Sequence, residues 1–334
     1  MPALTLCARC LLGNPGRCKD ARIAHFQRGK RPVPPAVTKL GDARLRSGEV
    51  LPTGTPVSRR GCPAWDYNSQ HPKGWRKRCP PQQACRALQG SRGQRDERLT
   101  SRHSAIMEED SCTVERRDAT LSYSLFIEQY AFSRPVILRG ITDNLEFQAQ
   151  CTKDKLLAKF GDRPVRLSTA NTYSYRKVDL PFQDYVDQLL EPQDQTSLGS
   201  ETLYFFGDNN FTEWGPLFRK YTPPPFRIPG TTGVYSFGIA GPGSGVPFHW
   251  HGPGYSEVIF GRKRWFLYPP EKMPEFHPNK TTLSWLLDTY PFLPPWERPV
   301  ECTIHPGEVL YFPDRWWHAT LNLDTSVFIS TFLG

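Results

Sequence analysis

The chain has 334 residues, 38% of them hydrophobic, which allows one large domain or two small ones around a sizeable core. Its formal net charge of +9 is unevenly divided. Residues 1–106 contain 21 Lys and Arg against 6 Asp and Glu, whereas the remainder contains 21 basic and 27 acidic residues. No apolar run reaches the roughly 18 residues that a transmembrane helix needs, so we expect no membrane span.

Residues 1–106 are predicted to form a disordered basic extension. Proline and glycine are scattered through them, and no apolar periodicity is sustained. Burial could therefore hardly offset the entropy lost on ordering them. Such a charge could bind phosphates, but no aromatic stacking pattern or known binding fold accompanies it, and we expect no nucleic-acid partner.

The domain is predicted over residues 107–334 and opens with helices. Apolar spacing and the positions of glycine and proline indicate helices over 121–132, 153–160 and 182–190, with strands over 135–139 and 165–169. This helical part spans about residues 120–200, and short strands dominate after it.

The barrel is predicted over residues 203–334. Its candidate strands are 203–207, 234–240, 255–260, 264–268, 300–304, 309–312, 317–323 and 326–332. Short strands separated by glycine and proline are typical of a small antiparallel barrel or jelly roll, whose mouth is a common ligand site. Residues 270–299, rich in proline, tryptophan and charge, are expected to form a helical insert or a lid over one end of the barrel.

Three histidines are the strongest chemical signal. His249 and His251 are one residue apart, so on a strand both side chains point to the same face. His318, at the end of Trp316-Trp317-His318, comes from a distant strand. Such a trio can form a three-sided metal site with open positions, although the usual third ligand of a facial triad is a carboxylate. Three imidazoles suit zinc and can also hold iron, and the alternative is that His251 only packs within a site that has lost its metal.

The order of the motifs resembles the JmjC branch of the cupin-like oxygenases over residues 121–334. After His249 come Gly261-Arg262-Lys263, then Pro306-Gly307-Glu308 and Trp316-Trp317-His318. The segments 241–245 and 322–325 are most similar to hydroxylases of the jumonji-domain-6 type. This resemblance implies a mainly β double-stranded β-helix, or jelly roll, preceded by helices.

The same resemblance implies cofactors and a substrate class. Fe(II) would be held by His249, His251 and His318, and 2-oxoglutarate by Lys263 and Tyr204, with a protein side chain as substrate. Without a cosubstrate, Lys263 would need a structural salt bridge, and Tyr204 would be a core aromatic residue.

Three positions depart from the family pattern and leave two functions open. His251 replaces the acidic ligand, Val246 stands where relatives often have threonine, and Ser256 where many have asparagine. The first hypothesis is a regulatory, protein-interacting member with weak or absent oxygenase activity, which holds Fe(II), another divalent metal or none. The second is an active Fe(II)- and 2-oxoglutarate-dependent protein hydroxylase.

The compartment is predicted from the resemblance, the sequons and the cysteines. Asn210 and Asn279 begin Asn-x-Thr triplets and are expected to carry glycans. Of the three domain cysteines, Cys112 and Cys151, both near the start of the domain, are the expected disulfide pair, which leaves Cys302 free. The resemblance implies the endoplasmic-reticulum lumen. The cytoplasm is the alternative, because the first residues do not form a clean signal peptide.

Overall fold

The structure, a computed structural model, describes residues 101–174 and 176–334. Most of the predicted basic extension lies outside the described residues. Its last six residues belong to a helix over 101–107. No helix in the described part of the chain is long and apolar enough to cross a membrane.

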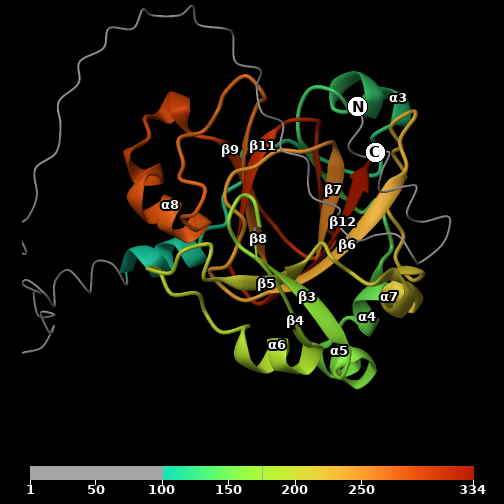
Figure 1. The fold of residues 1–334 in the computed structure, drawn as a ribbon. Coiled ribbons are helices and arrows are strands. Elements are labelled where there is room, and N and C mark those ends of the chain that lie inside the picture. Colours follow the sequence, from blue (N-terminus) through green and yellow to red (C-terminus); the bar gives the residue numbers. More distant parts are fainter. Residues whose placement is uncertain (1–100, 175) are drawn as a thin grey trace, which may run out of the picture. The chain divides into compact units, whose positions relative to one another are not determined.

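Two sheets form the body of the domain and confirm the predicted mainly β fold. In Figure 1, β6, β7 and β12 of the larger sheet stand opposite the smaller sheet of β8, β9 and β11. The larger sheet has the order β1-β2-β10-β7-β12-β6-β5-β3-β4, and the smaller one β11-β8-β9. The strands are β1 (Arg116–Arg117), β2 (Val136–Arg139), β3 (Pro164–Thr169), β4 (Lys177–Pro181), β5 (Leu203–Phe206), β6 (Gly233–Ala240), β7 (Gly254–Phe260), β8 (Lys263–Tyr268), β9 (Val300–Ile304), β10 (Glu308–Phe312), β11 (Trp317–Asn322) and β12 (Ser326–Leu333).

Short helices precede and interrupt the strands. They are α3 (Tyr123–Gln129), α4 (Leu145–Gln150), α5 (Lys153–Phe160), α6 (Phe182–Gln188), α7 (Phe211–Phe218) and α8 (Thr282–Asp288), with 3-10 turns η1 (Tyr290–Phe292) and η2 (Pro295–Glu297). Helices α4 to α7 bury their apolar side chains with β3, β5 and β6 in one core cluster. Within it, Phe160 stacks on Trp214 with the ring centroids 4.0 Å apart. Apolar burial of this kind, about 1.5–3 kcal/mol for each large side chain, holds helices this short in place.

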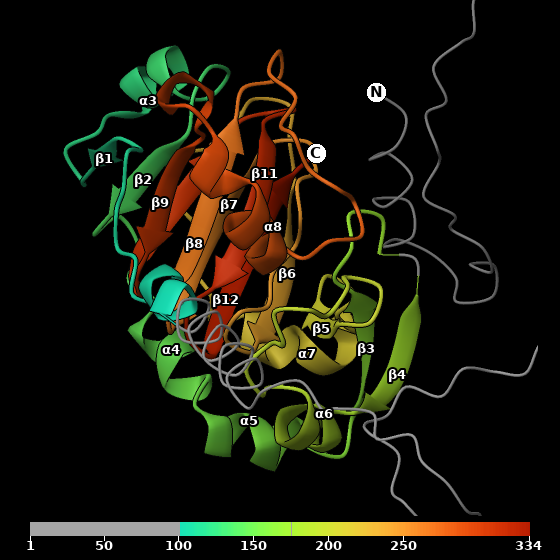
Figure 2. The ribbon, with the colours of Figure 1, turned by 90° about the vertical axis from the view of Figure 1, so that its left-hand side faces the viewer.

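Alternation along β8 and β11 separates the inside of the barrel from its outside. Lys263 pairs with Asn322 and Trp265 with Thr320, and all four side chains line an internal cavity. The alternate residues of both strands face outward, and Phe266, Ala319 and Leu321 among them pack against α8 of the insert. The insert therefore covers the outer face of the smaller sheet, as Figure 2 shows, and not an end of the barrel.

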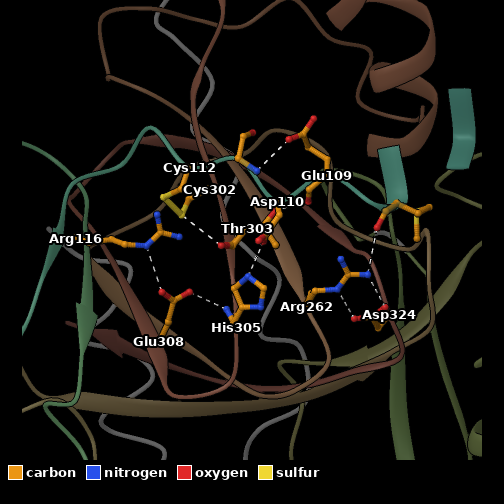
Figure 3. Close-up of polar contacts among 12 residues, drawn as sticks. Glu109, Asp110, Cys112, Arg116, Arg262, Cys302, Thr303, His305, Glu308 and Asp324 are labelled. Atoms are coloured by element: carbon orange, nitrogen blue, oxygen red, sulfur yellow. Dashed lines mark hydrogen bonds and ion pairs between the residues drawn. A yellow bond between two sulfur atoms is a disulfide. The ribbon is translucent and has the colours of Figure 1, made fainter. Parts of the chain in front are cut away.

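The disulfide joins Cys112 to Cys302, so the predicted Cys112–Cys151 pair is wrong (Figure 3). The segment before β1 runs along the free edge of β9, where the backbone N–H of Thr113 donates to the carbonyl of Glu301 over 2.7 Å. This pairing places Cys112 opposite Cys302, although 190 residues separate them. Cys151 is a free thiol buried in the separate cluster beneath α4 to α7.

Candidate metal and anion site

The structure brings the three predicted histidines together. His249 and His318 form an isolated antiparallel bridge, in which each backbone N–H donates to the other carbonyl over 3.1 and 2.8 Å. His251 lies two residues further along, and the candidate ligand nitrogens of all three lie within 4.8 Å of one another. Two chain segments almost 70 residues apart are thus joined at the point where the imidazoles meet.

Backbone carbonyls fix the orientation of each imidazole. The Nδ1 atoms of His249, His251 and His318 lie 2.9, 2.8 and 2.9 Å from carbonyl oxygens, which belong to Pro247, Gly252 and Trp316. A carbonyl only accepts, so each neutral ring carries its hydrogen on Nδ1 and keeps the Nε2 lone pair for another partner. This is the tautomer that metal binding through Nε2 requires.

The spacing of the free nitrogens fits a divalent ion. Nε2 of His251 lies 3.2 Å from Nε2 of His318. Two lone pairs this close repel each other unless a proton or a cation lies between them. Bonds of about 2.0–2.1 Å to one metal, at angles between octahedral and tetrahedral, would hold two nitrogens roughly 2.8–3.4 Å apart.

Burial keeps these histidines neutral. It lowers the pKa of His249 to about 4, with a further contribution from the neighbouring His251. Burial also lowers the pKa of His251, and it lowers that of His318 well below the ordinary value, assisted by repulsion from the other two rings. Near neutral pH all three imidazoles can therefore act as ligands without first losing a proton.

A cavity of about 120 Å³ extends from the histidines into the barrel. Its walls include all the residues singled out from the sequence for cosubstrate binding or for departure from the family pattern. These are Tyr204, Val246, His251, Ser256 and Lys263. Aromatic walls, among them Trp265, Phe312, Phe328 and Phe332, limit the water inside.

Lys263 lies in this cavity as a buried amine with no acidic partner. It is 4% exposed, its Nζ lies 3.3 Å from Oδ1 of Asn322, and Phe328 covers it with the ring centroid 3.5 Å from Nζ. No ion pair among the described residues includes it, so the alternative of a structural salt bridge does not hold there. Burial lowers its pKa to about 7. An anionic ligand would supply the missing counter-charge.

Tyr204 offers a protonated hydroxyl in the same cavity. Burial raises its pKa far above the ordinary value, and the neighbouring Ser174 only partly opposes that shift. The phenol therefore remains a hydrogen-bond donor at any physiological pH.

Several polar residues of the cavity were missed in the sequence. Asn322 accepts from Lys263 and donates through Nδ2 to the carbonyl of Ser244 over 2.9 Å, so its amide is fixed from both sides. Thr320 donates its backbone N–H to the carbonyl of Val246, and its side-chain oxygen accepts from the Val246 N–H over 3.2 Å. A hydroxyl is thus present beside Val246. Alternation from His318 could have identified both residues.

The two sequon asparagines lie on separate surface segments. Asn210 is exposed and caps α7, accepting from the backbone N–H groups of Thr212 and Glu213. Asn279 is half-buried, and its Oδ1 accepts from the N–H of Ser200 over 2.9 Å. Glycosylation at either asparagine stays a prediction.

Comparisons of the sequence with a family model and with curated proteins agree with the resemblance described above. The cupin-like domain family matches residues 123–332. The chain is 78% identical to human JmjC domain-containing protein 8 over 230 residues, which cover 69% of this chain and 87% of that protein. It is 28% identical to the chicken 2-oxoglutarate and iron-dependent oxygenase JMJD4, over 53% of this chain and 47% of the relative. Among solved structures, Escherichia coli YcfD, a ribosomal oxygenase in complex with cobalt and 2-oxoglutarate, has a TM-score of 0.40 and 21% identity, covering 64% of this chain and 52% of that one.

Proposed function

This chain belongs to the cupin-like domain family, and from that membership we propose that it is a JmjC-fold protein of the endoplasmic-reticulum lumen that binds a divalent metal and a 2-oxo acid. Its all-histidine metal site leaves it with weak or absent oxygenase activity, and it acts mainly through protein partners. The observation that carries the binding part of the proposal is the buried Lys263 without a counter-ion, in the same cavity as three correctly oriented histidines.

Each residue has a role in this proposal. His249, His251 and His318 hold the metal through Nε2, while Lys263 and Tyr204 hold the far carboxylate of the 2-oxo acid and orient it toward the histidines. Fe(II) with 2-oxoglutarate, when bound, would supply oxygen activation coupled to decarboxylation of the oxo acid. The aromatic walls exclude water, which strengthens the attraction between Lys263 and an anion.

The reduced activity is argued from the ligand charge. A neutral imidazole at position 251 leaves the metal with one negative charge fewer than a carboxylate would give. Carboxylates are also harder ligands than imidazoles. The three-histidine site should therefore hold ferrous iron less firmly than a site with a carboxylate, and the bound iron should be more difficult to oxidise. The three imidazoles also suit zinc, which does not change its oxidation state.

An active protein hydroxylase is the second candidate, and one observation favours it. The cavity keeps its polar lining beyond the family motif, because Thr320 supplies a hydroxyl beside Val246 and Asn322 fixes Lys263. A site that had lost all ligand binding would gain stability by replacing its buried lysine with an apolar residue.

Calorimetry on the purified full chain separates the two candidates. Protein loaded anaerobically with Fe(II) or Zn(II) is titrated with 2-oxoglutarate, and succinate release is measured with candidate peptides. We expect binding that is lost in Lys263→Ala and kept in the surface control Lys159→Ala, with little succinate. Rapid succinate release that depends on peptide and iron would establish the hydroxylase instead, and no binding of 2-oxoglutarate at all would refute the proposed site.

The lumenal location and the protein partner have their own support and test. The Cys112–Cys302 disulfide favours an oxidising compartment, and both sequons are at least partly accessible. We expect glycosidase to increase the electrophoretic mobility of the cellular protein. Unchanged mobility together with a reduced Cys112 would favour the cytoplasm.

The protein partner is tested with variants of the site. A partner that still binds His249→Ala and Lys263→Ala would support the regulatory role, whereas loss of the partner in both variants would favour an enzyme–substrate contact.

A further inference from the structure

Glu257 is buried on the opposite side of β7 from the histidine cavity. Its neighbour Ser256 lines the barrel interior, and alternation along the strand turns Glu257 outward, beneath the segment that precedes α4. Glu257 is 2% exposed. No ion pair within the described ranges includes it, so its carboxylate has hydrogen bonds but no counter-charge.

The hydrogen bonds of Glu257 occupy its two oxygens unequally. Nδ2 of Asn144 donates to Oε1 over 3.2 Å and to Oε2 over 2.9 Å, and the hydroxyl of Tyr221 donates to Oε2 over 3.0 Å. A carboxylate oxygen has two lone-pair sites, about four for the whole group. Oε2 is therefore fully used, while Oε1 keeps one acceptor site.

Glu257 also lines a second cavity, of about 230 Å³, outside the barrel. Glu257 and Asp143 are the ionisable residues among its described walls, and no Lys, Arg or His lines it. Leu145, which is 70% exposed, contributes apolar surface together with Ile259. Thr142, Asn144 and Gln148 add polar groups to the walls. A cavity that combines apolar surface with a small number of polar groups is a common form of ligand site.

We propose that this second cavity binds a primary ammonium group on a short aliphatic stem, with the ammonium on Oε1 of Glu257 and the stem against Leu145. A guanidinium fork binds best when both carboxylate oxygens are free, whereas an ammonium is a compact charge that one free acceptor site can hold. Burial raises the pKa of Glu257 to about 7, against the opposing effect of the Asn144 and Tyr221 hydrogen bonds. A bound cation would stabilise the ionised carboxylate and lower that pKa.

Calorimetric titration of the full chain at pH 8 tests the ligand chemistry. The probes are n-butylammonium, n-butylguanidinium and n-butanol. We expect n-butylammonium to bind about tenfold more tightly than the guanidinium, and butanol not to bind. Equal binding of butanol would mean that the cavity recognises only the apolar stem and would overturn the proposal.

Two variants test the residue. Glu257→Gln should weaken n-butylammonium binding by about tenfold or more, because it removes the buried charge. Asp143→Asn is the matched control at the same cavity, since its side-chain oxygen can still accept from the N–H of Leu145. It should change the affinity by less than about threefold. Undiminished binding by Glu257→Gln refutes the proposal.

Two further measurements complete the test. If Glu257→Gln fails to fold, the carboxyl titration of Glu257 in the native chain, followed by isotope-edited infrared spectroscopy, replaces it. Its pKa should fall when n-butylammonium is added, and an unchanged pKa would count against the site.

Nα-acetyl-lysine methylamide distinguishes the source of the ammonium. Binding equal to that of n-butylammonium indicates a lysine side chain of another protein, and binding of the free amine alone indicates a small metabolite.

Discussion

The Nε2 atoms of His251 and His318 face each other at 3.2 Å, and each ring is held in that orientation by a carbonyl at its Nδ1. The side chain at position 251 is therefore directed toward that of His318. Because the carbonyl of Gly252 fixes the ring of His251, the orientation favours binding through Nε2 over packing alone. Substitution of His251 can test how this side chain affects the affinity for Fe(II).

His251→Asp should bind Fe(II) about tenfold more tightly than the native chain, a gain of ~1.4 kcal/mol, because an anionic oxygen ligand replaces a neutral nitrogen. His251→Ala should bind it more weakly than either. Iron content after anaerobic loading and desalting, measured by atomic emission, checks the order. Equal occupancy in all three proteins would mean that position 251 is not a ligand position.

Lys263→Met should abolish 2-oxoglutarate binding and also stabilise the protein. The folded pKa of about 7 lies below the unfolded value near 10.5, so between these values the unfolded chain binds more protons. The free energy of unfolding of the native chain should therefore rise with pH from about 7 to 10.5, and at pH 7 the variant should be more stable by up to about 4 kcal/mol. Urea denaturation at several pH values measures this. A native chain that loses stability over that pH window would contradict the buried, uncompensated lysine.

Glu257→Gln should change stability in a different pH window and with the opposite sign. The folded pKa of Glu257, about 7, lies above the ordinary 4.5, so the folded chain binds more protons between these values. Native stability should fall by about 3 kcal/mol as the pH rises from 4.5 through 7. The variant lacks this titration, so its advantage over the native chain should grow across the window. Parallel curves for the two proteins would show that Glu257 titrates normally.

Some elements could be predicted because local pattern and tertiary structure agree. Lys153–Phe160 has helical spacing and a glycine at its end, and α5 has these bounds. Helix α7 was missed because Gly215 and Pro216 lie inside it and both oppose helix formation. It forms because Asn210 caps it and because Trp214 is buried in the core, and the burial cannot be read from the local sequence.

In the site, too, some features could be predicted from the sequence and others depend on the tertiary structure. His249, His251, His318 and Lys263 could be identified because their spacing follows a family motif and the strand period places them on one face. The state of Lys263 could not be predicted, since the absence of an acidic neighbour depends on which strands meet around it. The pairing of Cys112 was predicted wrongly for a related reason. It depends on the segment before β1 lying along β9, a contact that closes only when the barrel is complete.

The disulfide gives the last prediction. Cys112→Ser and Cys302→Ser should each lower the free energy of unfolding by about 2–5 kcal/mol, because the bond closes a long loop in the unfolded chain. The double variant should have a free energy of unfolding no lower than that of the less stable single variant, because both changes remove the same bond. Cys151→Ser is the matched control, since it leaves the disulfide in place and exchanges the buried thiol for a hydroxyl. Reductant should destabilise the native chain and Cys151→Ser but not Cys112→Ser, as measured by urea denaturation with and without dithiothreitol. If reductant destabilised Cys112→Ser as much as the native chain, another pair of cysteines would form the stabilising bond, and the position of the segment along β9 would have to be reconsidered.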